Sequence, residues 1–151
     1  MSRMTIRERL EDADLLWRNG RFQGALLSVL VAASATARHS APRRTGDRAA
    51  FVAFMKSTHA WTISIEYRGA QVDMDNLLYT WMRCELVHTG ALPADIRFDS
   101  ELADPTECVV RAGGAPGYTV LISHGWYHLL ADAVRNAAVN QDLFTLESRQ
   151  G

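Results

Sequence analysis

An arginine and a histidine lie five residues apart in the segment R-C-E-L-V-H-T-G, which runs from Arg83 to Gly90. A histidine can accept or donate a proton near neutral pH, whereas an arginine stays charged and can bind phosphate oxygens through two N–H groups. On an α-helix, five positions separate two side chains by about 140°. We therefore expect Arg83 and His88 to cooperate most easily across a two-fold axis, where a second copy repeats both residues.

A purely structural interpretation of the same pair stays open. Arg83 would then pair with Glu85, Asp73 or a backbone carbonyl, and His88 would lie at the C-terminal end of its helix, where cations are favoured. Cys84 lies four residues before His88 and shares its helix face. Because no third group that could complete a nucleophile or a metal site is close in sequence, we expect Cys84 to be a small buried residue.

A second pair of histidines, His124 and His128, is also four residues apart. Together with Asp132 on the same helix face, this pair could supply metal ligands. A fourth ligand is not evident in the sequence, and histidines near the start of a helix commonly cap it or face solvent. We therefore predict no metal and no other cofactor.

Basic residues are concentrated in the first third of the chain. Residues 1–48 contain nine arginines and five acidic residues, whereas the net charge of the whole chain is −1. A local group of arginines attracts phosphates, although solvated loops often have the same composition. The candidate RNA-binding residues in this group are Arg38, Arg43, Arg44 and Arg48.

Length and composition indicate one domain of a water-soluble protein. The chain has 151 residues, of which 48% are hydrophobic and 22% charged, values typical of a globular domain. Its two cysteines are too few for a disulfide framework. The most apolar run, from Phe22 to Ala37, is too short to cross a bilayer. We expect a cytoplasmic protein that makes no contact with a membrane.

The elements around the arginine–histidine pair are expected to be helical. Apolar periodicity predicts a helix that ends at Gly20, a central helix over residues 21–39, and a third helix after Asp47. Asp73 or Asp75 is expected to cap the helix that carries the pair and ends near Gly90. Residues 57–72 show β-branched alternation but lie between helices, and are predicted to continue a helix or to be irregular.

The pattern changes after Pro93. Two short β-branched segments around a Gly/Pro turn predict a β-hairpin over about 107–123. Ser123 is then expected to cap a C-terminal helix over about 124–138. The predicted fold is therefore mainly α, a helical bundle with a β-hairpin inserted before the C-terminal helix.

The segment L-L-Y-T-W-M-R-C-E-L-V-H-T-G, which ends at Gly90, resembles the signature helix of HEPN domains, which carry an R-x4–6-H motif. The N-terminal run A-D-L-L-W-R-N-G-R-F-Q-G-A-L-L, from Ala13 to Leu27, is also similar to the start of those domains. The resemblance spans a helical core of about residues 5–92 within a single domain, 1–151.

This resemblance implies metal-independent RNA cleavage by a homodimer, as in RNase toxins that a partner antitoxin or another regulatory protein controls. His88 would then be the acid or base, and Arg83 would hold the phosphate. Active relatives commonly have a polar residue directly after the arginine, where this chain has Cys84. The alternative is therefore a catalytically inactive HEPN-like dimer that binds a protein or a nucleotide as a scaffold or regulator.

Overall fold

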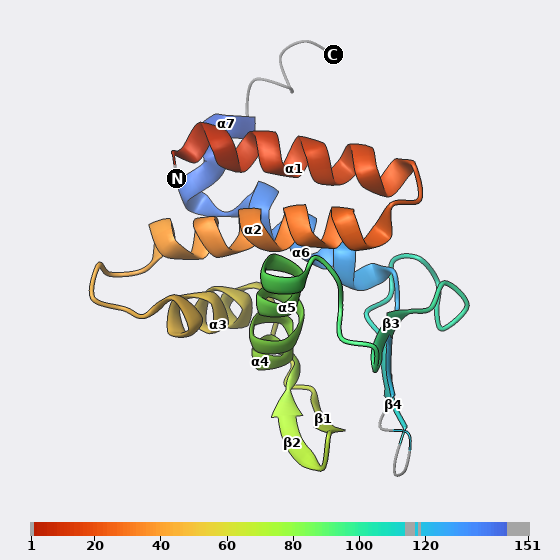
Figure 1. Cartoon of the computed structure of the whole chain (residues 1–151). Coiled ribbons are helices and arrows are strands. Elements are labelled where there is room, and N and C mark those ends of the chain that lie inside the picture. Colours follow the sequence, from red (N-terminus) through yellow and green to blue (C-terminus); the bar gives the residue numbers. More distant parts are fainter. Residues whose placement is uncertain (1, 114–116, 118, 145–151) are drawn as a thin grey trace.

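The helix at the centre of the fold is α2 (Phe22–Ser40), whose buried face consists largely of alanine, valine and leucine side chains. In the computed structural model, which describes residues 2–113, 117 and 119–144, helix α2 contacts α1, α3 and α6 (Figure 1). The helical elements are α1 (Arg3–Arg18), α2, α3 (Asp47–Thr58), α4 (Met74–Leu77), the π-helix η1 (Leu78–Arg83), α5 (Cys84–Thr89), α6 (Gly125–Asn136), the 3-10 helix η2 (Ala138–Asn140) and α7 (Gln141–Phe144).

Small residues allow the other helices to lie close to α2. Alanines 25, 32, 33 and 37 are buried on this helix, so neighbouring backbones can approach without steric conflict. Helices α4 and α5 run across α2 and α3 (Figure 1), and the intervening η1 contacts both α2 and α3. A mainly helical fold is thus confirmed, and none of the helices that the structure describes is long and apolar enough to cross a membrane.

The prediction for residues 57–72 was wrong, because the second half of this segment forms strands. Strands β1 (Ser64–Tyr67) and β2 (Ala70–Asp73) make an antiparallel hairpin that extends from the helical body (Figure 1). Ile65 and Tyr67 are buried while their sequence neighbours are exposed, which is the period-two pattern of a half-buried strand. The alternation of apolar and polar residues in this segment was therefore the correct indication of a strand.

Asp95 binds the residues at the tip of this hairpin. Arg68 and Gly69 both have positive φ angles, 51° and 82°, as the tight turn between right-twisted strands requires. The Tyr67 hydroxyl donates to Asp95 Oδ1 at 2.7 Å, and Arg68 Nε donates to Asp95 Oδ2 at 2.8 Å. The Arg68 guanidinium also lies 4.7 Å from the ring centre of Trp81. Charge, hydrogen bonds and ring contacts together hold the turn.

This arrangement predicts an acid-sensitive contribution to stability. The hydrogen bond from Arg68, and then that from Tyr67, hold the pKa of Asp95 below its ordinary value. Since the pKa is lower in the folded state, the contribution is present above about pH 4 and is lost as the pH falls through the folded pKa. In urea unfolding at pH 7 and pH 3, we expect Asp95→Asn to lose less stability on acidification than the unchanged chain. An equal loss would contradict this role, and Asp104→Asn is the exposed control.

The predicted second hairpin is confirmed. Strands β4 (Val110–Ala112) and β5 (Val120–Ile122) pair antiparallel before α6, and β3 (Ile96–Phe98) adds a parallel pairing to β5 that the sequence did not predict. The predicted turn includes residues 114–116 and 118, which lie outside the described residues.

The start of α6 differs from the prediction that Ser123 caps it. Helix α6 begins at Gly125, and the Ser123 hydroxyl instead accepts a hydrogen bond from the Val109 backbone N–H. The same hydroxyl donates to the carbonyl of Glu107, so it joins the chain before β4 to the end of β5. Residue 125 must be a glycine, because a Cβ atom on it would lie 2.2 Å from the carbonyl oxygen of Glu107.

Candidate functional site

The arginine–histidine motif lies on a continuous helical run formed by α4, η1 and α5. Asp73, one of the two predicted caps, is the N-cap of this run, and its carboxylate accepts a hydrogen bond from the Asn76 backbone N–H at 2.8 Å. Gly90 ends the run in the left-handed conformation, with a φ of 79°. The π-helix ends at Arg83 itself. Segments of π-helix are rare and often occur at functional sites.

Arg83 is a half-buried cation that meets no acidic side chain in residues 2–113 and 119–144. Its guanidinium carbon lies 5.4 Å from the centre of the Tyr79 ring, and its Nε is buried without a hydrogen-bond acceptor. Within the part of the chain that the structure describes, Arg83 forms no ion pair, and Asp73 is occupied by Asn76. The expected structural pairing of Arg83 with Glu85 or Asp73 is therefore not formed. A positive charge held in this way can accept an anionic ligand.

His88 is exposed in the last turn of α5. No hydrogen bond, ion pair or ring contact joins its imidazole to another described residue, so both ring nitrogens can reach a ligand. Because Arg83 and His88 are separated by five helical steps, their side chains leave the helix about 140° apart. The structure thus brings the two residues onto adjacent turns but does not join them within one chain.

Tyr79 connects Arg83 to the start of α3. Burial raises the pKa of the Tyr79 hydroxyl, while the charges of Arg83 and Arg48 act in the opposite direction and that of Asp47 adds to the rise. The centre of the Tyr79 ring also lies 5.4 Å from that of the Phe51 ring, so Tyr79 packs on α3. Arg48 also lines a cavity of about 270 Å³ together with Trp81 and Asn76. One of the four predicted RNA-binding arginines is therefore near the motif helix.

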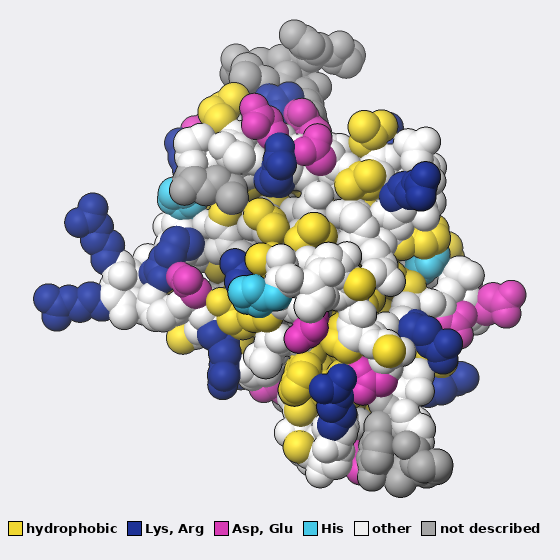
Figure 2. Space-filling view, in the orientation of Figure 1, with side chains coloured by type: hydrophobic (Ala, Val, Ile, Leu, Met, Phe, Trp, Pro, Cys, Tyr) yellow, Lys and Arg dark blue, Asp and Glu magenta, His cyan; other side chains and the backbone are white. Residues whose placement is uncertain are grey.

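The other three arginines are in or next to the loop between α2 and α3. Arg38 holds this loop, since its guanidinium donates to the carbonyls of Pro42, at 2.7 Å, and Thr45, and lies 3.3 Å from Asp47. Arg43 and Arg44 are exposed. Figure 2 shows basic side chains extending from the end of the molecule where this loop lies in Figure 1. Arg43 and Arg44 are therefore accessible to a ligand, whereas Arg38 orders the loop that presents them.

The second histidine pair belongs to an aromatic cluster. His124 and His128 contact the ring of Trp17, with centroid separations of 4.9 Å and 5.5 Å, and burial, followed by the charge of His128, lowers the pKa of His124. Among the described residues, no group of three or more Cys, His, Asp or Glu side chains is arranged to hold a metal ion. Cys84 and Cys108 are free and half-buried.

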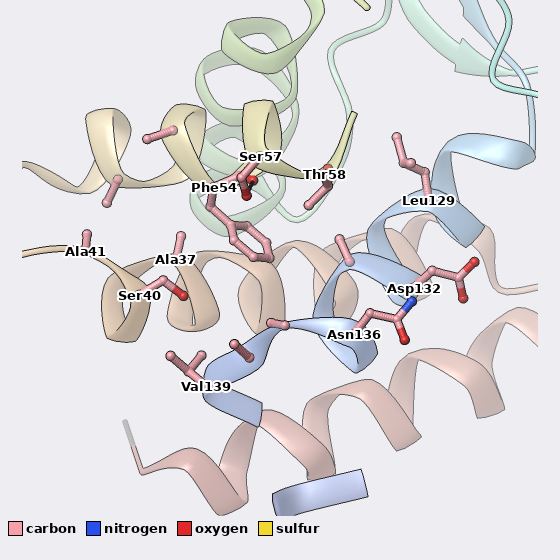
Figure 3. Close-up of a pocket in the computed structure, with 15 residues that line it drawn as sticks. Ala37, Ser40, Ala41, Phe54, Ser57, Thr58, Leu129, Asp132, Asn136 and Val139 are labelled. Atoms are coloured by element: carbon pink, nitrogen blue, oxygen red, sulfur yellow. Dashed lines mark hydrogen bonds between the residues drawn. The ribbon is translucent and has the colours of Figure 1, made fainter. Parts of the chain in front are cut away.

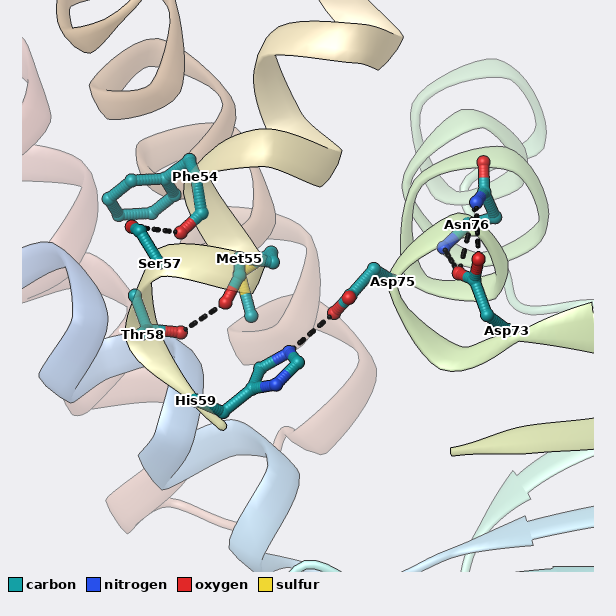
Figure 4. Close-up of polar contacts among 8 residues, drawn as sticks. All are labelled: Phe54, Met55, Ser57, Thr58, His59, Asp73, Asp75 and Asn76. Atoms are coloured by element: carbon teal, nitrogen blue, oxygen red, sulfur yellow. Dashed lines mark hydrogen bonds and ion pairs between the residues drawn. The ribbon is translucent and has the colours of Figure 1, made fainter. Parts of the chain in front are cut away.

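A buried His–Asp pair beneath the motif helix was not found from the sequence. His59 Nε2 lies 3.0 Å from Asp75 Oδ1, and the two side chains are only 4% and 6% exposed. Figure 4 shows His59 at the end of α3 pointing toward Asp75 at the start of α4. The Trp61 ring stacks on His59 at 3.7 Å. Since His59 and Asp75 are 16 residues apart, no local pattern marks them as partners, and together they set the position of the motif helix on α3.

Comparisons with protein-family models, with curated proteins and with solved structures found no match to this chain. The geometry of the residues themselves is therefore the basis for a functional assignment.

Proposed function

We propose that this protein is a HEPN-like endoribonuclease, an RNase toxin that acts as a homodimer without a metal ion or other cofactor. The observation that carries the proposal is the state of Arg83, which is half-buried, has no acidic partner among the described residues and lies at the end of a π-helix. Burying a cation without a counter-charge lowers the stability of the fold, unless a ligand supplies the negative charge. The scissile phosphate of RNA supplies that charge.

The exposed His88 supports the chemistry. RNA contains its own nucleophile, the 2′-hydroxyl, so cleavage needs a base, an acid and stabilisation of the phosphate charge. In a two-fold dimer, His88 of one copy removes the 2′-hydroxyl proton, and the oxygen attacks phosphorus. The bond to the 5′-oxygen breaks, and His88 of the second copy protonates that oxygen. Products are a 2′,3′-cyclic phosphate and a 5′-hydroxyl.

A dimer also addresses the divergence of the two side chains. Arg83 and His88 leave one helix in different directions, so Arg83 of one copy and His88 of the other are the natural partners at a shared phosphate. Val87, next to His88, is an apolar side chain that is 45% exposed, and burial of this residue at the dimer interface would stabilise association.

Flanking basic residues extend the proposed site along the RNA. Arg48 lines the same cavity as Trp81 of the motif helix, and the exposed Arg43 and Arg44 continue the positive charge onto the loop before α3. Arg38 contributes by holding that loop. Contacts of this kind bind the phosphate backbone without reading the base sequence. In the cell we propose a cytoplasmic location, control by an antitoxin or other regulatory protein, and no membrane partner.

A second candidate function is supported by the packing of the motif. The Arg83 guanidinium packs over the Tyr79 ring, and the next residue is the half-buried Cys84. In this second function the helix has no catalytic role and forms a dimer surface. This is the inactive HEPN-like scaffold or regulator that binds a protein or a nucleotide. Slower growth of an expressing host that depends on His88 favours the toxin, and normal growth favours the scaffold.

The direct test uses one oligonucleotide sequence made as RNA and as DNA, incubated with purified protein in EDTA. We expect cleavage of the RNA only, with cyclic phosphate ends, because the DNA lacks the 2′-hydroxyl. Absence of RNA cleavage, or cleavage that requires an added divalent ion, would refute the proposed mechanism. Cross-linking of the same sample reports whether the protein is dimeric.

A further inference from the structure

A cavity of about 650 Å³ lies between α3 and α6, away from the motif residues. Its walls come from the end of α2, from α3, and from α6 with the following turn (Figure 3). Alanines make up much of the lining, and Phe54, Leu129 and Val139 complete the apolar surface. Cavities of this volume and character are typical of sites for small organic molecules.

The hydroxyl groups in the lining are available only as acceptors. Ser40 donates its proton to the Thr36 carbonyl at 2.8 Å. Ser57 and Thr58 donate theirs to carbonyls of α3, at 2.6 Å and 2.7 Å. Because each hydroxyl has a single proton, only oxygen lone pairs remain for a ligand. These three hydroxyls therefore favour a ligand that brings hydrogen-bond donors.

The charge at the cavity is negative. Asp132 lies at its edge beside Asn136 (Figure 3), and its side chain is 68% exposed. Arg135 forms an ion pair with Asp132, at 3.8 Å between Nη1 and Oδ1, and its Nη2 is hydrogen-bonded to Asp14, so one cation is shared by two carboxylates and one negative charge is left over. Among the described residues, no lysine or arginine lines the cavity. The Asp132 carboxylate is thus available to a cationic ligand.

We infer that this cavity binds a small amphiphilic amine. The apolar body of the ligand lies against the alanines and Phe54, and its ammonium group lies at the edge, near Asp132 and the acceptor hydroxyls. Apolar burial provides most of the affinity, and the carboxylate selects for positive charge. A carboxylic acid with the same body is disfavoured, because it meets the like charge of Asp132 and the three hydroxyls offer it no proton. This inference is independent of the proposed RNA cleavage.

The test uses three probes with one apolar body, 4-phenylbutylamine, 4-phenylbutanol and 4-phenylbutyrate, titrated calorimetrically at low ionic strength. We expect the amine to bind about three- to fivefold more tightly than the alcohol, because an exposed ion pair contributes only a small free energy. The acid should bind most weakly. Equal affinities for all three probes, or no saturable binding of the amine, would overturn the inference.

Two variants locate the binding. Asp132→Asn is expected to reduce amine affinity to that of the alcohol without changing the affinity for the alcohol, whereas the control Asp104→Asn changes neither. Ala53, an exposed residue of the lining, can be replaced by tryptophan to fill the cavity, which should abolish binding of all probes. Thermal unfolding of Ala53→Trp verifies that it is folded. Unchanged amine binding in Asp132→Asn, or in folded Ala53→Trp, would place the ligand elsewhere and refute the site.

Discussion

The variant His88→Ala is expected to cleave RNA at least about a hundredfold more slowly than the unchanged chain, the scale of effect for losing a general acid or base. In the proposed dimer both the base and the acid are His88, so one substitution removes both proton transfers. The folded structure should be unaffected, because the imidazole is exposed and forms no hydrogen bond with the described residues. Single-turnover cleavage, with circular dichroism on the same sample, measures both quantities.

Arg83 provides the companion measurement. Arg83→Ala should reduce cleavage by a similar factor, since the phosphate loses its fixed cation, while Arg83→Lys should retain part of the activity because charge remains but the two-pronged contact is lost. The exposed Arg97 offers a matched control, and Arg97→Ala should cleave normally. If His88→Ala and Arg83→Ala both keep full activity, the assignment of the site is wrong. A pure scaffold would show no cleavage in any of these proteins.

The largest expected effect on stability comes from the buried His59–Asp75 pair. Asp75→Ala should lower the free energy of unfolding by about 3 kcal/mol, because it removes a hydrogen bond with a charged group and leaves a buried imidazole with no partner. His59 Nδ1 has no hydrogen-bond partner among the described residues, and Nε2 is the ring nitrogen that meets Asp75. For a chain of this length the melting temperature should fall by about 6–12 °C.

A double-mutant cycle separates this pair interaction from simple loss of packing. Once His59→Ala is present, Asp75→Ala should cost clearly less than it does alone, because the interaction is already absent. Asp104→Asn, an exposed acidic substitution, should change the melting temperature little. Strictly additive losses from the two alanine variants would show that His59 and Asp75 stabilise the fold independently, and would remove the pair as the connection between α3 and the motif helix.

Local patterns in the sequence predicted those elements whose cause is itself local. The small-residue run that forms α2, the Asp73 cap, the Gly90 helix end and the β4–β5 hairpin all follow from residues within a few positions of one another. Arg83 and His88 were selected in the same way, by residue type and spacing. The turn residues Arg68 and Gly69 contained a similar local signal, but the adjoining helices led to the wrong prediction for residues 57–72.

The sequence by itself thus determined the main helices and the second hairpin, and it singled out Arg83 and His88 as the residues to test for chemistry. Only the tertiary structure decided that Arg83 has no acidic partner in the described part of the chain, that His59 meets Asp75, and that Arg38 holds a loop. The same applies to the cavity beside Asp132, whose walls come from distant helices. The physical reason is that hydrogen-bond partners, charge compensation and cavities depend on packing between segments far apart in the chain, whereas periodicity and caps act within one segment.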